Sequence, residues 1–447
     1  MHVIVVGAGE VGSYVAERLS REGHDVAVVE LDASRLRQLS DDLDVLTVEG
    51  SGTHPATLRR AGVEQADLLV AVTSNDEVNL ISSLLAKSIG IERSIVRIEA
   101  AELRGADAEK VRVASGADLV IDPDAEAAAE VLELLDFPGA DEVAYMAGGE
   151  VIVIGARLPD HAPLIGRTLK DIGEEFEPDW DFVVGSIGRG EETIIPRRDH
   201  RLEPGDHVRV ALKKRARRMV TELLGLDRGS LNRIMLLGGG RTAEILAERL
   251  AGRGVQVVIV ERNPERARTL AENLDDVLIL EGDIADADLL EEADVGRYDM
   301  VVALTGEDDA NILACLYAKS VGAGETVAVV HRLALLSLLG QAGIDVALSP
   351  RTATANGVLR FVRGDVAAVA TFLQGDAEVI ELEIAPQSPA DGALVKDLGL
   401  PKDVLIGAFV RDGKPQIARG RSRLRGRDHI VAFAMPSAVD EVHRVLG

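Results

Sequence analysis

Two glycine-rich turns carry the residue types in this chain that are best suited to chemistry. The first, Gly7-Ala8-Gly9-Glu10-Val11-Gly12, has complete G-x-G-x-x-G spacing between an apolar run and a helical pattern. Its first glycine permits a tight turn, its second lets the backbone approach a pyrophosphate, and its third lets a helix pack closely on a sheet. The helix N-terminus adds free N–H donors and a positive dipole. The motif therefore predicts a dinucleotide site.

An acidic residue supports this prediction. Glu30 ends the next apolar run, about twenty residues beyond the first glycine, where such sites place a carboxylate. A carboxylate there accepts hydrogen bonds from ribose hydroxyls and repels a 2′-phosphate, so NAD(H) or an adenosine nucleotide is favoured over NADP. The alternative is that the glycines serve chain geometry alone and that Glu30 is a solvated strand end.

A second turn repeats the first with changes. It is Gly238-Gly239-Gly240-Arg241-Thr242-Ala243, and Glu261 keeps the acidic position. Alanine in the third glycine position still permits fairly close packing. Arg241 replaces an acid, and a guanidinium beside a phosphate turn suits the additional charge of ADP or ATP. The alternative is a vestigial site in which Arg241 is an ordinary surface charge.

Polar residues also follow the later strands of each copy. Thr73 and Ser74 come after the fourth apolar run, at the edge where ligands bind in such sheets, and could contact the ribose or nicotinamide side of a dinucleotide. Equally, Ser74 or Asn75 could cap the next helix. Arg97 ends the fifth run and could reach a phosphate or pair with a carboxylate. We take His331 as its approximate counterpart in the second copy.

No set of side chains forms a recognisable catalytic group. A dehydrogenase needs a general acid or base beside its substrate, and no motif here supplies one. His207 and His429 share one repeat position, where a turn residue at a strand entrance is favoured over a catalytic or metal role. Cys315 is the only cysteine, so an intrachain disulfide is excluded, and we expect a buried apolar residue. We therefore predict no catalytic residue and no metal.

The elements that must position these residues are duplicated. Residues 2–12 match residues 233–243, and the later strand patterns match at nearly the same offset. Short apolar runs alternate with helical patterns, which is typical of parallel βαβ units. The predicted fold is α/β, with two Rossmann-type doubly wound parallel sheets, each followed by a small α+β domain. The expected domains are residues 1–138, 139–226, 231–364 and 365–447, with a linker at 227–230.

The amino-acid composition excludes some functional classes of protein. The 447 residues include 49 Lys and Arg against 75 Asp and Glu, a net charge of −26. Such an acidic chain lacks the dense basic face that general nucleic-acid binding requires, so no nucleic-acid partner is expected. No apolar window is long enough to predict a transmembrane helix. Together with the single cysteine, which favours a reducing compartment, the lack of such a window predicts an intracellular protein.

The order large–small–large–small, the opening Gly-Ala-Gly-Glu-Val-Gly and the Gly-Asp-His-Val motif closing the first small domain resemble the TrkA family. These proteins are the regulatory subunits of Trk potassium uptake systems, and the resemblance spans essentially the whole chain. It implies RCK N-terminal domains for the large units and RCK C-terminal domains for the small ones. The site residues it implies are Gly7, Gly9, Glu10, Val11, Glu30, Thr73, Ser74 and Arg97 in the first unit, and Gly238, Gly240, Arg241, Thr242 and Glu261 in the second.

The same resemblance implies a function. The cofactors would be NAD(H), with ATP or ADP at one or both Rossmann sites. The partner would be a membrane-embedded Trk-type potassium-translocating subunit, whose flux the ligand state gates. The protein would form a homo-oligomeric ring, expected to be a tetramer, in the cytoplasm and peripheral on the inner face of the cell membrane. Two alternatives stay open: an NAD-dependent oxidoreductase on a duplicated Rossmann domain, and a structural assembly with degenerate sites.

Overall fold

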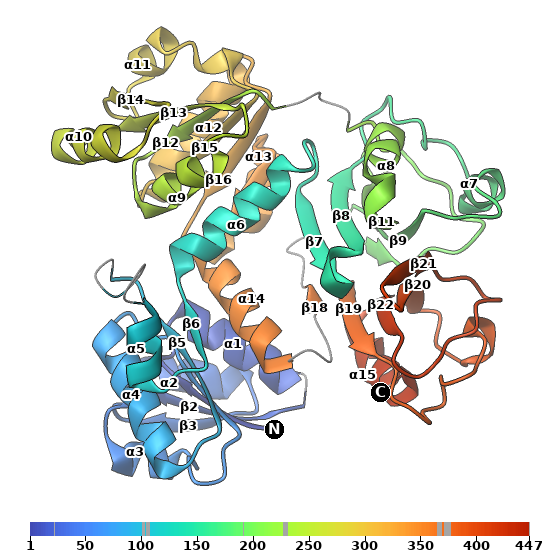
Figure 1. The fold of residues 1–447 in the computed structure, drawn as a ribbon, viewed down its shortest axis with the longest axis horizontal. Coiled ribbons are helices and arrows are strands. Elements are labelled where there is room, and N and C mark those ends of the chain that lie inside the picture. Colours follow the sequence, from blue (N-terminus) through green and yellow to red (C-terminus); the bar gives the residue numbers. More distant parts are fainter. Residues whose placement is uncertain are drawn as a thin grey trace.

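Four modules follow one another along the chain, in the order large, small, large, small (Figure 1). The computed structural model describes residues 1–447 apart from 22, 101–102, 104–107, 191, 227–230, 364–368, 371–376 and 447. The expected linker at 227–230 therefore lies outside the described residues. No helix of the described ranges combines the length and apolarity needed to cross a bilayer.

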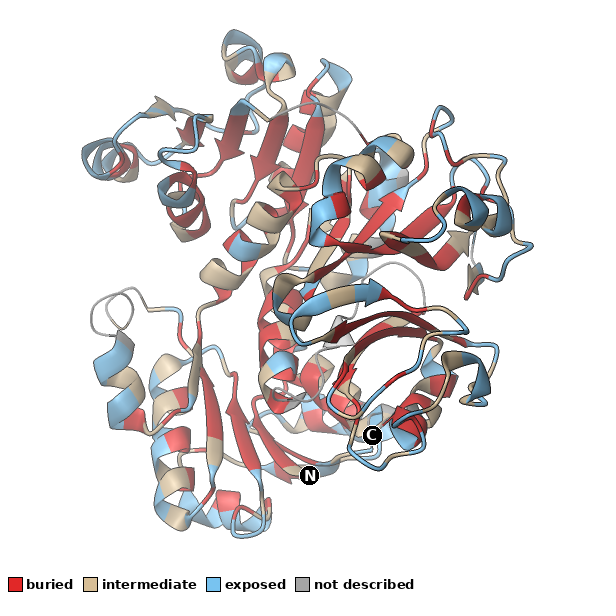
Figure 2. Ribbon diagram, turned by 45° about the vertical axis from the view of Figure 1, so that its right-hand side comes forward, coloured by how far each residue is buried: buried red, intermediate tan, exposed pale blue. Residues whose placement is uncertain are grey.

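The first large module is a doubly wound parallel sheet with strand order β3-β2-β1-β4-β5-β6. Its central strands are apolar and buried because helices cover both faces (Figure 2). Its elements are β1 (His2–Val6), α1 (Glu10–Arg21), β2 (Asp25–Glu30), α2 (Ala33–Asp42), β3 (Leu46–Glu49), α3 (Pro55–Arg60), β4 (Leu68–Ala71), α4 (Asp76–Ile89), β5 (Arg93–Arg97), α5 (Ala108–Ser115), β6 (Leu119–Ile121) and α6 (Pro123–Leu135).

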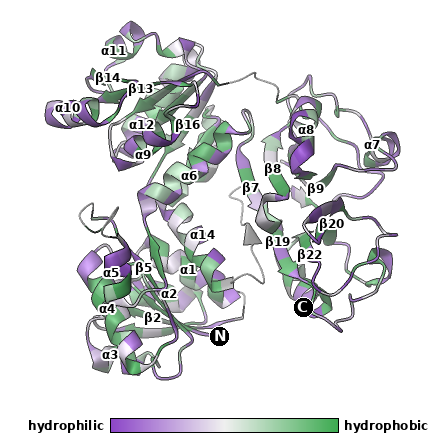
Figure 3. Ribbon diagram, viewed as in Figure 1, coloured by the Kyte–Doolittle hydropathy of each residue, from purple (hydrophilic) through white to green (hydrophobic). Residues whose placement is uncertain are grey.

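The second large module repeats that topology, with strand order β14-β13-β12-β15-β16-β17. Hydrophobic residues concentrate on its strands as they do in the first (Figure 3). Its elements are β12 (Arg233–Leu237), α9 (Arg241–Leu250), β13 (Gln256–Glu261), α10 (Pro264–Asn273), β14 (Val277–Glu281), α11 (Ala287–Glu292), β15 (Met300–Ala303), α12 (Asp308–Ser320), β16 (Glu325–Val329), α13 (Leu333–Ala342), β17 (Val346–Leu348) and α14 (Pro350–Arg363).

The small modules are antiparallel sheets with peripheral helices, ordered β10-β9-β11-β8-β7 and β18-β19-β22-β20-β21. Phe433 packs between them, since a Cβ on Gly185 or Gly407 would press on its ring. Their elements are β7 (Glu142–Met146), β8 (Val151–Arg157), α7 (Leu169–Glu175), β9 (Phe182–Arg189), β10 (Glu192–Ile194), β11 (His207–Lys213), α8 (Arg217–Leu223), β18 (Val369–Ala370), β19 (Glu378–Glu383), β20 (Val404–Arg411), β21 (Lys414–Ile417), β22 (His429–Ala434) and α15 (Val439–Leu446).

The two large modules exchange their last helices. The apolar stripe of α6, with Val131 and Leu134, is buried in the core of the second module against β12 and α9. Conversely, Val358 and Leu359 of α14 lie in the core of the first module, against α1. Both helices cross between the two sheets in Figure 1. Each nucleotide-type turn therefore has a helix of the opposite module beside it.

Candidate functional site

The first glycine turn has the close approaches that its spacing predicts. Gly7 has φ +105°, and a Cβ there would lie 3.1 Å from the backbone N of Thr73. A Cβ on Gly12 would collide with the carbonyl oxygen of Gly7. Packing therefore requires glycine at the first and third positions of the turn. Gly9, at the second position, is different, because a Cβ there would meet only the Arg35 guanidinium, at 4.0 Å. The backbone at Gly9 is open to a ligand.

The acidic residues Glu30 and Glu261 are each hydrogen-bonded to the glycine turn of their own module. Glu30 Oε2 accepts a hydrogen bond from the N–H of Ala8 at 2.7 Å, and its Oε1 accepts one from Leu31 at 2.8 Å. In the second copy, Glu261 Oε2 accepts from the N–H of Gly239 at 2.8 Å. These bonds hold each carboxylate at the end of its strand and beside its glycine turn. An ionised carboxylate has further lone pairs for ribose hydroxyls.

The loop after β4 is held by a buried side chain, Asn79, that no motif in the sequence marks as functional. Asn79 is fully buried. Its Oδ1 accepts two hydrogen bonds from Thr73, one from the backbone N–H at 2.9 Å and one from the Oγ1 hydroxyl at 2.7 Å. Its Nδ2 donates to the carbonyls of Thr73 and Arg97, at 3.0 and 2.9 Å. Asn75 caps α4 by accepting from the N–H of Val78 at 2.7 Å, and Ser74 is exposed. The Thr73 hydroxyl is thus already bonded within the protein.

Asn311 repeats this arrangement in the second copy. Its Oδ1 accepts from the N–H and Oγ1 of Thr305, at 3.1 and 2.6 Å, and its Nδ2 donates to Val329 O at 2.8 Å. The signal that could have revealed both asparagines was their recurrence at one repeat position, on the apolar side of a helix. They brace the loops that line the ligand edge.

The pairing of Arg97 with His331 is wrong in register. Asn79 bonds the carbonyl of Arg97, and its equivalent bonds the carbonyl of Val329, so Val329 is the counterpart of Arg97. His331 instead corresponds to Glu99, because their N–H groups donate to the equivalent acids Asp308 and Asp76. The two-residue offset is hard to see in the sequence, because apolar strands contain few residues that mark the register.

Arg97 and His331 also differ in their partners. Arg97 pairs with Glu99, and its Nη1 lies 3.5 Å from Thr73 O. The His331 ring contacts Asp308 at 3.1 Å. Burial raises the pKa of Asp308, but hydrogen bonds from His331 and Arg332 outweigh burial and lower it overall. Asp308 is therefore an ionised carboxylate whose hydrogen bonds hold the loop after β16 in place.

The open space at the two turns differs. At the second turn a cavity of about 220 Å³ is bordered by predicted site residues, namely Gly238, Gly239, Gly240 and Glu261. Thr305 also borders it. At the first turn a cleft of about 730 Å³ runs between α1 and α2. Its lining includes Ala8, Gly9, Glu10 and Arg35, but none of Thr73, Ser74 or Arg97. The second cavity thus joins its glycines to their acid, but Arg241, Thr242 and His331 do not line it. The first cleft reaches its glycine turn without the acid Glu30.

The residues that open the helices after the turns have defined partners. Arg241 Nη1 donates to Glu244 Oε2 at 3.0 Å, and Arg266 joins the same carboxylate at 3.2 Å while donating to Gly239 O at 2.9 Å. Thr242 Oγ1 donates to Asp124 Oδ1 of α6 at 2.9 Å. The Val11 side chain is buried in the core, so only its backbone faces the turn. Two guanidinium groups thus flank the second turn.

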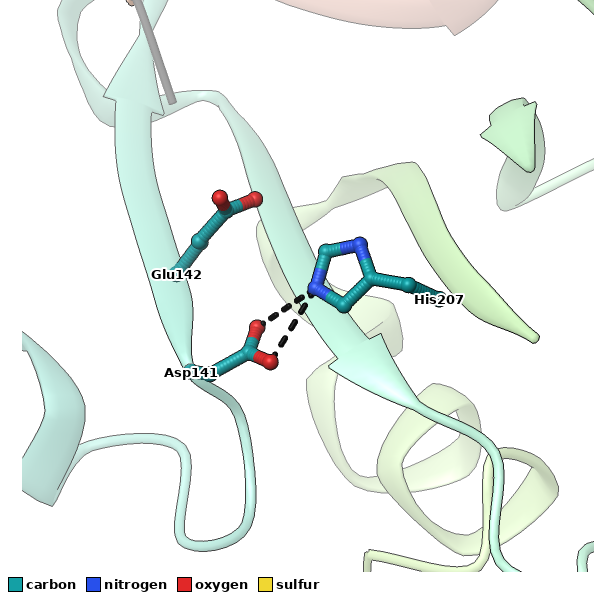
Figure 4. A group of neighbouring side chains, drawn as sticks. All are labelled: Asp141, Glu142 and His207. Carbon is teal, nitrogen blue, oxygen red and sulfur yellow. Dashed lines mark hydrogen bonds and ion pairs between the residues drawn. The ribbon is translucent and has the colours of Figure 1, made fainter. Parts of the chain in front are cut away.

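His207 is more than a turn residue at a strand entrance. It begins β11, is buried, and its Nε2 lies 2.8 Å from Asp141 Oδ1, with Glu142 beside it (Figure 4). The ligand atoms of these three residues lie within 4.8 Å of one another, as a metal site would require. However, the fully buried Arg209 forms a two-pronged ion pair with Glu142, at 2.7 and 3.1 Å.

The protonation state of His207 completes this network. Burial lowers the pKa of His207, but the charge and hydrogen bond of Asp141 raise it overall. With His207 protonated, the network of two acids and two bases is neutral. Its ligand atoms are then engaged with one another, which favours a structural network over a metal centre.

Cys315 agrees with its prediction. It is fully buried on α12, in the core of the second large module. Burial raises the pKa of its thiol to about 12, so the nucleophilic thiolate is strongly disfavoured. Its thiol donates to Val327 O at 3.4 Å. Cys315 is therefore a core residue rather than a nucleophile.

Two doubly wound sheets, each with a glycine turn and an acid fastened to it, define a tandem Rossmann protein. The family descriptions TrkA-N domain and TrkA-C domain match residues 3–123 and 234–350, and 153–225 and 379–447, respectively. The Trk system potassium uptake protein TrkA of Halomonas elongata is 35% identical over 97% of this chain and 96% of its own. A TrkA homolog of Archaeoglobus fulgidus is 34% identical over 100% of both chains. The chain therefore belongs to the TrkA family, as its motifs indicated.

Solved structures agree with this fold. The GsuK channel bound to NAD matches with a TM-score of 0.60 and 17% identity, covering 100% of this chain and 78% of that one. The GsuK RCK domain matches with a TM-score of 0.58 and 18% identity, covering 100% and 94%. At these identities the likeness establishes the RCK-type fold alone.

Proposed function

We propose that this chain is a nucleotide-binding regulatory subunit that gates a Trk-type potassium uptake protein in the membrane in response to NAD(H), ATP or ADP. The observation that carries the proposal is the pair of glycine turns, each with an acid, Glu30 or Glu261, hydrogen-bonded to the turn itself. Membership of the TrkA family supports the potassium uptake partner. The NAD-bound GsuK channel shares this fold, which supports NAD(H) as one ligand.

The arrangement of the small modules favours regulation over hydride transfer. An oxidoreductase places its substrate domain over the nicotinamide, so that a general acid or base can reach the reacting carbon. Here the two small sheets pack against each other through residues such as Val153, Val379 and Phe433. Figure 1 shows them stacked beside the large modules. A subunit that transmits ligand state needs such rigid contacts more than it needs a substrate pocket.

The exchanged helices supply a physical route for gating. A ligand shifts an equilibrium only by its differential affinity for two states. Because α6 and α14 each lie in the core of the opposite module, a movement at either turn alters contacts in both. A coupling of about 1–3 kcal/mol is typical of such systems.

Equivalent helices in the two large modules expose apolar side chains. Ile81 and Leu84 of α4 are 43% and 51% exposed, and Leu313 of α12, the repeat partner of Ile81, is 65% exposed. Exposed apolar faces of this kind mark interaction sites. Their recurrence is consistent with assembly of several copies. That the assembly is a ring, expected to be a tetramer and docked on the cytoplasmic face of the membrane partner, is proposed from membership of the TrkA family.

Calorimetric titration with NADH, ADP and ATP tests the nucleotide sites. Glu30→Lys should abolish binding at the first turn and Glu261→Lys at the second, because each places an ammonium group where ribose hydroxyls need an acceptor. Glu248→Gln, an exposed carboxyl on α9, is the control and should bind like the wild type. Binding that survives the double variant unchanged would place the ligands elsewhere.

Two further measurements test the rest of the proposal. Enzyme-like oxidation of NADH with small carbonyl substrates, followed at 340 nm, would overturn the regulatory assignment. Capture from membranes, with and without NADH or ATP, should recover a potassium transporter. Failure to recover one under every ligand condition would contradict the Trk partner.

A further inference from the structure

The exchanged helices bring a charged residue of one large module to the glycine turn of the other. Arg351, the second residue of α14, forms an ion pair with Glu10, which opens α1 at the first turn. Asp124, the second residue of α6, accepts the hydrogen bond from Thr242 at the second turn. Arg351 and Asp124 occupy equivalent positions of the repeat, since each follows the proline that begins its helix. The turn residues that they contact, Glu10 and Thr242, lie one repeat position apart.

The charges at these equivalent positions are inverted. The first turn carries an acid of its own, Glu10, and receives a cation, Arg351, from the other module. The second turn carries a cation of its own, Arg241, and receives an acid, Asp124. Arg241 is held by Glu244 of its own helix at 3.0 Å. The duplication therefore preserved the crossing of the two helices, while the charges at these positions became opposite.

A phosphate group at the first turn would exchange the partners of Arg351. An anion there repels Glu10 and attracts the guanidinium, which forms strong paired hydrogen bonds to phosphate. The side chains of Arg351 and Glu10 are 33% and 47% exposed, so neither is locked in the core. Exposed ion pairs contribute little net stability, so this pair can be exchanged readily.

We infer that Arg351 is a phosphate-binding residue of the first nucleotide site, supplied by the second large module, whereas Asp124 opposes phosphate charge at the second site. This inference rests on the proposed function and assigns a regulation to it. Ligand at the first turn draws α14 towards the first module. Ligand at the second turn weakens the contact of α6 with α9. The two sites therefore act on the interface between the modules with opposite sign.

The first test isolates the first site. In a Glu261→Lys parent, which leaves only the first site competent, titration calorimetry with NADH, ADP and ATP identifies the ligand. Arg351→Gln should then weaken its binding about ten-fold or more, because a charge-assisted contact to phosphate is lost. Glu10→Gln should tighten it, because a competing and repelling carboxylate is removed.

A matched control lies on the same helix. Arg360 of α14 also pairs across the modules, with Glu126 at 2.5 Å, but it lies more than two helical turns from the glycine turn. Arg360→Gln should leave nucleotide affinity within two-fold of the parent. Equal losses from Arg351→Gln and Arg360→Gln would show a general packing effect and overturn the assignment. Arg351→Lys keeps the charge and should lose less affinity than the glutamine variant. An affinity as low as that of Arg351→Gln would count against a phosphate contact.

The second test isolates the second site. In a Glu30→Lys parent, Asp124→Asn should tighten nucleotide binding, and ATP should gain more than NADH because it brings more negative charge. Weaker binding after Asp124→Asn would overturn the opposite sign of the two sites. If neither parent binds NADH, ADP or ATP, the proposed function fails along with this inference. If the parents bind and Arg351→Gln has no effect, only the assignment of Arg351 fails.

Discussion

At the scale of single residues, a buried amide braces each candidate site. Asn79 uses both its carbonyl and its amide group to bond the loop after β4 and the end of β5. Buried backbone groups are costly when they lack partners, so one side chain here satisfies several. Glu30 and Glu261 act similarly at the glycine turns. The protein's own groups thus preorganise the site.

Removing that amide should destabilise the first large module. Asn79→Ala leaves the N–H of Thr73 and two carbonyls without their partner, and we expect a loss of about 2–4 kcal/mol in the free energy of unfolding. Urea denaturation measures it. Ser74→Ala, at the exposed neighbouring position, should change stability by less than about 0.5 kcal/mol. A similar small change for Asn79→Ala would contradict the bracing role.

At the scale of elements, two carboxyl groups near the crossing of α6 and α14 have raised pKa values. Burial, followed by the charge of Glu133, raises the pKa of Glu130 on α6 to about 8. Burial raises that of Glu133 itself to about 7. The groups that face Glu130 are Glu126 and Glu133 on its own helix and Arg360 and Asn356 on α14. The junction between the large modules therefore contains carboxyls that favour the protonated form.

This arrangement predicts a pH dependence of stability. A carboxyl whose pKa is raised in the folded state loses its proton more readily when unfolded, so stability falls as pH rises between about 4.5 and about 8. Glu130→Gln, which mimics the protonated form, should therefore raise the free energy of unfolding at pH 8 by about 1 kcal/mol or more, and by less at pH 6.

Thermal or urea unfolding at both pH values measures this effect. Glu248→Gln, which changes an exposed carboxyl on α9, should alter stability little at either pH. A Glu130→Gln variant that is less stable than the wild type at pH 8 would show that the charged form is favoured in the fold.

At the scale of the whole molecule, the duplication places two copies of one large-plus-small unit in a single chain, related by pseudo-symmetry. The large modules share two exchanged helices, and the small modules share one stacked pair of sheets. Apolar side chains remain exposed in each large module, Ile81 and Leu84 on α4 of the first and Leu313 on α12 of the second. A unit with two such faces can join copies on either side, which is the geometry that a closed ring requires.

If these helices form the proposed ring, charges on both of them should prevent its assembly. Ile81→Asp and Leu313→Asp together place charges in two apolar contacts, and we expect the oligomer to dissociate in light scattering coupled to size exclusion. Each single change should give partial dissociation. Leu278→Asp alters a residue that is 53% exposed on the edge strand β14, away from both helices, and should leave the oligomer intact. An unchanged mass for the double variant would place the assembly surface elsewhere.

The duplicated Rossmann fold, both glycine turns and their acids are predictable from the amino-acid sequence alone. These features follow from local physics: strand and helix periodicity, and glycine positions where a Cβ would clash. The exchange of α6 and α14 between the modules is apparent only in the folded chain, because the apolar stripe of a helix fits either sheet equally well. For the same reason the contacts of Arg351 and Asp124 could not be predicted from the sequence. Each depends on which distant backbone the fold brings alongside, and spacing along the chain does not encode it.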